Sequence, residues 1–248
     1  MKTFFCIFAF VFFFITVSLC VAPTQDVTDS ISVCNEASLW RVGGIMTEEQ
    51  LEAAPADSLF SVSPIPDDVF RRMQGKSFPQ GCTITRGQLR YIRLLHYDFE
   101  GNVRCGELVC HQTIASSLKK IFEQLYAARY PIHSVRLIDD FDADDERSMR
   151  ANNTSCFCFR KVAGSKVLSK HSRGLAIDIN PLQNPCVRKN SKGVVTIQPS
   201  NAREYVNRSK KFRGRISPED LCYRLFRDAG FRWGGNWRTV KDYQHFEK

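Results

Sequence analysis

The sequence predicts an α+β fold with an antiparallel sheet. Two apolar runs, residues 89–96 and 103–110, flank a polar turn at residues 97–102, which is typical of a β-hairpin. Apolar residues then recur at helical spacing from Ile114 to Tyr126. Because helices and strands do not alternate regularly along the chain, an antiparallel sheet is favoured over the parallel sheet of a βαβ fold.

The first 22 residues have the layout of a signal peptide. One positive charge at Lys2 precedes an apolar run, residues 4–22, that ends in a small residue. Two alternatives stay open: residues 17–20 can form a lipoprotein cleavage box, and the run is nearly as long as the roughly 20 apolar residues of a membrane anchor. We therefore expect an exported protein, periplasmic or secreted, with no membrane span after leader removal; the alternative is a lipid or helix anchor in the envelope.

The rest of the chain is long enough for one domain with an attachment, since domains usually contain about 100 to 200 residues. Residues 23–66 carry several prolines and little periodic pattern, so we predict an N-terminal arm there. A capping box from Thr47 to Gln50 predicts one short helix within the arm. Residues 67–248 then form the domain.

Three further segments are predicted after the first helix. Residues 135–138 form a short strand that leads into an acidic stretch, and residues 183–215 are polar and irregular, as in a surface excursion. A C-terminal helix is predicted with Ser217 as its N-cap, Pro218 at its first position and Gly230 at its end.

The net charge of the chain is +9, which becomes +8 when the single charge of Lys2 is subtracted with the leader. A basic surface attracts polyanions, and for an exported protein these are anionic envelope polymers or lipid head groups rather than nucleic acid. In a surface that binds nucleic acid, clustered basic residues alternate with aromatic residues. Here the lysines and arginines are scattered along the chain, and only residues 203–215 are notably rich in them. We predict no nucleic-acid partner.

Eight of the ten cysteines follow the leader, and an even number suits disulfide bonds in an oxidising compartment. Two alternatives stay open. The cysteines can be free thiols that pack as small apolar side chains, or Cys105, Cys110 and His111 can bind a structural zinc ion, although a matching second pair of ligands is lacking. The eight are Cys34, Cys82, Cys105, Cys110, Cys156, Cys158, Cys186 and Cys222.

The most informative stretch is residues 169–180, because its second half alternates as a strand does. Its apolar residues point to one face, and Gly174, Ala176 and Asp178 point to the other. Two residues with almost no side chain leave open space beside the Asp178 carboxylate. The strand therefore clears room for something to approach Asp178.

His171 precedes this strand and can turn back over the same face, and His245 supplies a third ligand. A catalytic zinc ion needs three protein ligands and a position for water. Asp242, three residues before His245, is left to take the proton of that water. From spacing alone two plainer interpretations stay open: a histidine is more often structural, and an aspartate on a strand can simply pair with an arginine.

Two motifs carry a resemblance to a known family, Ser169-x-His171-x-x-Gly174-x-Ala176-x-Asp178 and Asp242-x-x-His245. In both motifs the chain resembles the zinc D-alanyl-D-alanine carboxypeptidases, a family that includes vancomycin-resistance D,D-peptidases and phage L-alanyl-D-glutamate endolysins. The resemblance extends to residues 152–155, 159–160, 178–181 and 233–237, so that it covers roughly residues 70–248.

The resemblance implies a small antiparallel sheet with helices packed on one side, as in D,D-peptidases and hedgehog-type domains. It also implies one zinc ion, held in a groove by His171, Asp178 and His245, with Asp242 as the general base. The implied partners are the stem peptides of peptidoglycan.

Three further residues receive roles from the resemblance. Arg160 matches an arginine that orients the substrate carboxylate or stabilises the oxyanion, a task that suits a guanidinium because it forms paired hydrogen bonds. The alternative for Arg160 is an ion pair with Asp144 or Asp145. Ser155 and Trp237 are expected to line the groove.

The predicted activity is that of a D-alanyl-D-alanine carboxypeptidase, because the chain has an export leader and no wall-binding repeat. One alternative is an L-alanyl-D-glutamate endopeptidase, which shares all these residues and differs in pocket shape. Another is a non-catalytic zinc module like the hedgehog-type domains. Asp242 favours an enzyme, since such a module has little need of a base three residues before its last ligand. The sequence gives no prediction of the oligomeric state.

Overall fold

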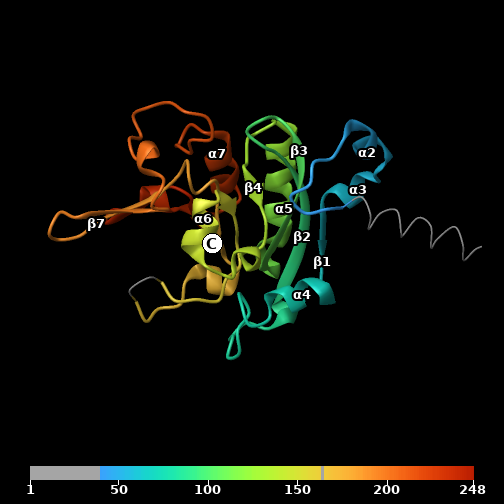
Figure 1. Cartoon of the computed structure of the whole chain (residues 1–248), viewed down its shortest axis with the longest axis horizontal. Helices are drawn as coiled ribbons and strands as arrows, with labels where there is room; N and C mark the ends of the chain where they lie inside the picture. Colours follow the sequence, from blue (N-terminus) through green and yellow to red (C-terminus); the bar gives the residue numbers. More distant parts are fainter. Residues whose placement is uncertain (1–39, 163–164) are drawn as a thin grey trace, which may run out of the picture. The chain divides into compact units, whose positions relative to one another are not determined.

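The computed structural model describes residues 40–162 and 165–248 (Figure 1), which have the α+β fold expected from the sequence. The predicted leader and Cys34 lie outside the described residues. Helices and small antiparallel sheets are mixed without regular alternation. Within the described ranges, no helix is both long enough and apolar enough to cross a membrane.

The longest strands form the predicted hairpin, which is thereby confirmed. β2 (Leu89–Tyr97) pairs with β3 (Val103–His111) in a continuous antiparallel register, from Leu89 opposite His111 to Tyr97 opposite Val103. β1 (Ser61–Ser63) pairs antiparallel with the other edge of β2.

One long helix packs against this sheet. α5 (Gln112–Ala127) begins directly after β3 and contacts β2 and β3, and Figure 1 shows it alongside them. Its apolar side chains Ile114, Leu118 and Phe122 are buried, which confirms the helix predicted from their spacing. Burial of each such side chain contributes about 1.5–3 kcal/mol. The sheet and α5 therefore supply much of the core.

The other helices are short. They are α2 (Glu48–Ala53), α3 (Ala56–Leu59), α4 (Asp67–Met73), α6 (Asp145–Arg150) and α7 (Leu221–Asp228). Single turns of 3-10 helix lie at Arg86–Gln88, Ile138–Phe141, Lys170–Arg173, Arg203–Tyr205 and Gly234–Asn236. The capping box of α2 is confirmed, because Gln50 N donates to Thr47 Oγ1 (3.2 Å) and Thr47 N donates to Gln50 Oε1 (2.9 Å).

Residues 40–66, which belong to the predicted arm, contribute α2, α3 and β1. Met46 and Phe60 from this segment are buried in the core. These residues therefore pack with the rest of the described chain. The start of the domain at residue 67 stays a prediction.

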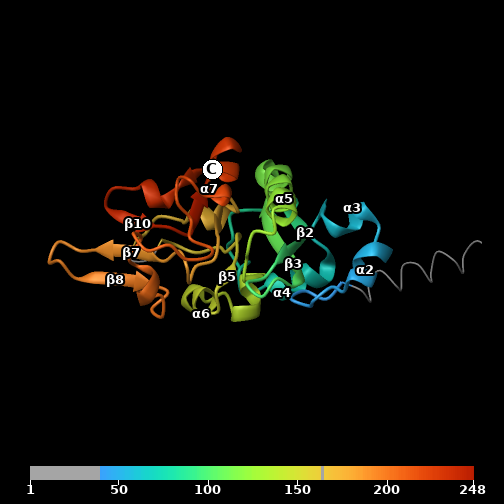
Figure 2. The same cartoon turned by 90° about the horizontal axis from the view of Figure 1, so that it is seen from above.

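The strands that follow α5 form three further sheets. In the first, β11 (His245–Glu247) lies between β6 (Ala176–Asp178) and β9 (Arg232–Trp233). In the second, β7 (Cys186–Lys189) lies between β8 (Val195–Gln198) and β10 (Val240–Asp242), as Figure 2 shows. Both sheets are antiparallel, whereas β4 (Ser134–Val135) and β5 (Asn153–Thr154) pair in parallel. The segment predicted to be irregular thus contains an ordered hairpin, β7–β8. The strand predicted at residues 135–138 is shorter, since a 3-10 helix begins at Ile138.

The last helix begins later than predicted. α7 starts at Leu221, and its N-cap is Asp220 rather than Ser217. The reason is a hydrogen bond that Asp220 Oδ2 accepts from Cys222 N (2.9 Å), which satisfies a free amide of the first turn. Gly230, at φ +84°, follows the helix as predicted.

The prediction of disulfide bonds is wrong for the seven cysteines that the structure describes, because all seven are free. Cys105 and Cys110 illustrate the reason: they are five residues apart on β3, so they face opposite sides of the sheet and lie about 17 Å apart. All but Cys82 are buried, and some of the thiols have polar contacts: Cys156 Sγ donates to Gly174 O (3.7 Å), and Cys186 forms a hydrogen bond with Asp242. The seven are Cys82, Cys105, Cys110, Cys156, Cys158, Cys186 and Cys222.

Gly174 fixes the turn between the 3-10 helix at Lys170–Arg173 and β6. Its φ is +64°, and a Cβ atom at this position would lie 2.6 Å from His111 N. Its carbonyl oxygen accepts a hydrogen bond from the same His111 N (2.9 Å). The turn is therefore docked against the end of β3 in a way that a side chain would prevent.

We predict that Gly174→Ala lowers the free energy of unfolding by about 1–3 kcal/mol from backbone strain alone, with a further loss from the contact with His111. Gly75→Ala is the matched control, because Gly75 also has a positive φ (+75°), but a Cβ atom there would have no neighbour within 4 Å. Urea unfolding of the three proteins measures both losses. Equal losses in the two variants would show that the docking of Gly174 contributes nothing.

Candidate metal centre

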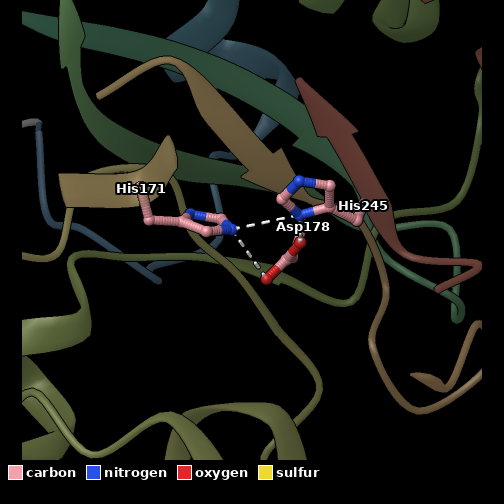
Figure 3. A group of neighbouring side chains, drawn as sticks. All are labelled: His171, Asp178 and His245. Carbon is pink, nitrogen blue, oxygen red and sulfur yellow. Dashed lines mark hydrogen bonds and ion pairs between the residues drawn. The ribbon is translucent and has the colours of Figure 1, made fainter. Parts of the chain in front are cut away.

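Three side chains from different elements meet at one point (Figure 3). His171 lies in the 3-10 helix before β6, Asp178 ends β6, and His245 begins β11, where it pairs directly opposite Asp178. His171 Nε2 lies 3.2 Å from His245 Nδ1 and 3.3 Å from Asp178 Oδ2, and His245 Nδ1 lies 3.0 Å from Asp178 Oδ1. The structure therefore brings the three predicted ligands together.

The spacing and chemistry of this group match a zinc site. Tetrahedral zinc with bonds of about 2.0–2.1 Å places neighbouring ligand atoms roughly 3.4 Å apart. The three separations here, 3.0, 3.2 and 3.3 Å, are close to that value. Two imidazoles and one carboxylate also leave a fourth position for water or substrate, as catalytic zinc sites do.

The turn that carries His171 is held at both ends. Ser169 caps its beginning, with Ser169 Oγ accepting a hydrogen bond from His171 N (3.2 Å). Gly174 ends it in the left-handed region of backbone conformation. The chain therefore reverses within a few residues, and His171 returns to the Asp178 face of the strand.

Both histidine rings are oriented by partners outside the group. His171 Nδ1 donates to Cys156 O (2.6 Å), and His245 Nε2 contacts Glu247 Oε2 (3.4 Å). The other oxygen of Glu247, Oε1, pairs with Arg232 (2.7 Å). These contacts leave His171 Nε2 and His245 Nδ1 facing each other as metal donors. Sequence reasoning missed Glu247, whose signal is its two-residue spacing from His245, because that spacing places both side chains on one face of a strand.

The group is electrostatically complementary. Burial favours the neutral form of Asp178, but the charges and hydrogen bonds of His171 and His245 outweigh it and hold the pKa of the Asp178 carboxyl well below its usual range. Burial likewise opposes protonation of His245, yet its hydrogen bonds to Asp178 and Glu247 raise the pKa of His245 to about 10. A divalent ion can replace the positive charge of the protonated imidazole, with release of its proton.

Asp242 lies at the end of β10, opposite Cys186 of β7. It lines the same cavity as the three candidate ligands. Its Oδ1 is buried and has no hydrogen-bond partner among the described residues. Burial raises the pKa of Asp242 to about 6; the charge of Asp178 adds to this rise, while His245 opposes it. A carboxyl group with a pKa near neutrality suits a residue that first accepts and then returns a proton.

The turn at Gly234–Asn236 packs directly on Asp242. A Cβ atom at Gly234 would lie 2.6 Å from Asp242 O and 2.9 Å from Asp242 Cβ, so this approach needs a glycine. Trp237 follows the turn, and its ring centroid lies 5.2 Å from that of His245. The turn thereby brings an aromatic ring to His245, one of the candidate ligands.

The ligands line a cavity of about 560 Å³ that Trp237, Arg160 and Asp145 also line. The Arg160 guanidinium forms an ion pair with Asp145 through Nε. This is the pairing that the plainer interpretation of Arg160 expected, and it is formed within the same cavity as the candidate ligands. The ion pair fixes the guanidinium beside them.

Ser155 is placed differently. It is not among the described residues that line the cavity. Its backbone bonds to Asp178 in both directions: Asp178 N donates to Ser155 O (3.0 Å), and Ser155 N donates to Asp178 O (3.3 Å). Ser155 therefore supports the strand that carries a ligand, and its contact with a substrate stays a prediction.

Residues 163–248 match the model of a protein family described as D-alanyl-D-alanine carboxypeptidase. The matched segment contains the three candidate ligands and Asp242, whereas Ser155 and Arg160 precede it. Searches of curated proteins and of solved structures gave no match.

We predict that zinc stabilises the protein through the three candidate ligands. Zinc at 100 times its dissociation constant should raise the free energy of unfolding by about 2.7 kcal/mol, and a chelator should reverse this gain. His171→Ala should lose most of the gain, because one of three ligands is removed. His133→Ala, which changes a histidine outside the group, is the control in the same thermal unfolding assay. An equal gain in His171→Ala would contradict the site.

Proposed function

We propose that this chain is a zinc-dependent D-alanyl-D-alanine carboxypeptidase, on the premise that its residues 163–248 belong to the D-alanyl-D-alanine carboxypeptidase family. The observation that carries the proposal is the cluster of His171, Asp178 and His245, whose ligand atoms lie 3.0 to 3.3 Å apart. Asp242 lies beside this cluster in one cavity. This combination provides a metal site and a separate acid-base group.

In this proposal, His171, Asp178 and His245 would hold one zinc ion, which would supply Lewis-acid chemistry to a substrate carbonyl and to water. Asp242 accepts the proton of the attacking water and then returns it to the leaving amine. Its buried Oδ1, which has no partner among the described residues, is free to accept that proton.

Arg160 supplies the positive charge of the site. Its guanidinium binds the carboxylate of the substrate or stabilises the oxyanion, while Asp145 holds it in place. Trp237 forms an aromatic wall of the cavity. Ser155 is proposed as a substrate contact because it pairs with Asp178.

The substrates in this proposal are the stem peptides of peptidoglycan, which an exported enzyme meets in the cell envelope. The family description favours a carboxypeptidase over an L-alanyl-D-glutamate endopeptidase. Asp242 favours an enzyme over a hedgehog-like zinc module, although a D,D-peptidase-like fold is common to both proposals. Mass spectrometry of digested muropeptides separates these functions: loss of one terminal alanine supports the carboxypeptidase, a cut within the stem supports the endopeptidase, and no cut supports the module.

We predict that Asp242→Ala lowers turnover of a D-alanyl-D-alanine peptide by about 10²- to 10⁴-fold, because it removes the general acid-base group. Zinc content should not change, since Asp242 is not one of the three candidate ligands. The measurements are release of D-alanine and elemental analysis of the dialysed protein. Asp228→Ala is the control, because Asp228 is exposed and pairs only with Arg227 among the described residues. Full turnover in Asp242→Ala would refute the proposed chemistry.

We predict that Arg160→Lys lowers kcat/KM by about 10- to 100-fold, because a hydrogen bond to a charged group is worth about 1.5–3 kcal/mol and an ammonium cannot form the paired contact. Asp145→Asn keeps the guanidinium and should cost less. Steady-state kinetics of both variants distinguish the two interpretations of Arg160. If Asp145→Asn costs as much as Arg160→Lys, the ion pair rather than the substrate contact explains the arginine.

A further inference from the structure

Gln244 lies between the candidate base and the last candidate ligand and lines the metal cavity. Only 2% of the residue is exposed. Its backbone oxygen accepts a hydrogen bond from Ile179 N (3.0 Å), which ties it to the chain just after β6. Its side-chain Oε1 is buried and has no hydrogen-bond partner among the described residues.

A second buried glutamine, Gln183, provides a comparison, because its side-chain oxygen is hydrogen-bonded within the protein. Gln183 is also buried, but its Oε1 accepts a hydrogen bond from Asn152 Nδ2 (2.9 Å), and it does not line the metal cavity within the described chain. Buried polar atoms are nearly always paired, because an unpaired one loses its hydrogen bonds to water without replacement. The unpaired amide oxygen of a residue that lines the cavity therefore indicates a donor that arrives with a ligand.

The surroundings of Gln244 narrow the chemistry of that donor. The same cavity is lined by four basic side chains, Arg160, Lys170, Arg173 and Arg188, and by four carboxylates, Asp145, Asp178, Asp242 and Glu247, so the charge of its lining is balanced. A balanced lining does not require a charged donor at Gln244, and the peptide substrate of the proposed function offers a neutral N–H group at each amide. Asp242, two residues earlier in the chain, also has a buried carboxyl oxygen, Oδ1, without a hydrogen-bond partner among the described residues.

We propose that Gln244 is a substrate-binding residue whose Oε1 accepts a hydrogen bond from a neutral backbone N–H of the bound peptide. This proposal rests on the proposed peptidase function. It assigns Gln244 a part in the selection of peptides, because a site with an amide acceptor discriminates against a substrate that lacks the matching N–H.

The test replaces both partners of this hydrogen bond. A peptide that ends in D-alanyl-D-alanine is compared with analogues in which each amide N–H is replaced in turn by an ester oxygen. Each is assayed with wild-type protein and with Gln244→Met, which keeps the size of the side chain but removes the acceptor. For one analogue, the wild type should lose about 10- to 100-fold more kcat/KM than the variant loses. Equal losses for every analogue would overturn the proposal.

Thermal unfolding provides a second test. If Gln244 had a structural role, its replacement would lower the midpoint temperature of unfolding. Gln244→Met should keep or raise the midpoint temperature of the metal-loaded protein, because no hydrogen bond among the described residues is lost. Gln183→Met should lower it, because the Asn152 amide loses its acceptor, and it should leave the ester discrimination unchanged. A drop in midpoint temperature in Gln244→Met as large as in Gln183→Met would also overturn the proposal.

The two proposals can fail separately. If the wild type cleaves no peptide, the proposed function is refuted and this proposal with it. If the wild type cleaves peptides but the losses are equal for every analogue, this proposal alone is refuted.

Discussion

The pairing of β6 with β11 is the contact on which the candidate site depends. Its register places His245 directly opposite Asp178. A slip of one residue would turn the side chains of β11 to the other face of the sheet and remove His245 and Glu247 from the site together. Phe246, which lies between them, is fully buried and stacks on Phe226 with ring centroids 4.3 Å apart. An apolar anchor on one face therefore fixes the register that aligns the polar groups on the other.

Burial of so many polar groups is tolerated because their outer contacts are satisfied. His171 donates to a backbone carbonyl, and His245 contacts Glu247, which pairs with Arg232. The atoms left without partners among the described residues include Asp242 Oδ1 and the Gln244 amide oxygen, both on residues that line the cavity. Unpaired buried atoms reduce stability, and their location here coincides with the space where the proposed metal and substrate would bind. The site thus lowers the stability of the fold in exchange for atoms that can contact the proposed metal and substrate.

The segment that matches the family model does not build the site by itself. Residues 163–248 contain the candidate ligands, but Cys156 supplies the carbonyl that orients His171, and the backbone of Ser155 bonds to Asp178. Gly174 is docked on the end of β3, which belongs to the hairpin supported by α5. The hairpin layer therefore serves as a base that holds the turn before β6 and, through it, the first ligand.

The sequence by itself determined the elements with strong local patterns: the β2–β3 hairpin and α5. Gly174, which we expected to clear space beside Asp178, instead lies in the turn that docks on β3, and of the two small residues only Ala176 belongs to β6. Only the tertiary structure decided which distant side chains meet, since the register of β6 and β11 depends on packing rather than on local propensity. The same holds for the free cysteines, whose bonding depends on distances between elements, and for Gln244, whose unpaired oxygen is evident only when its neighbours are in place.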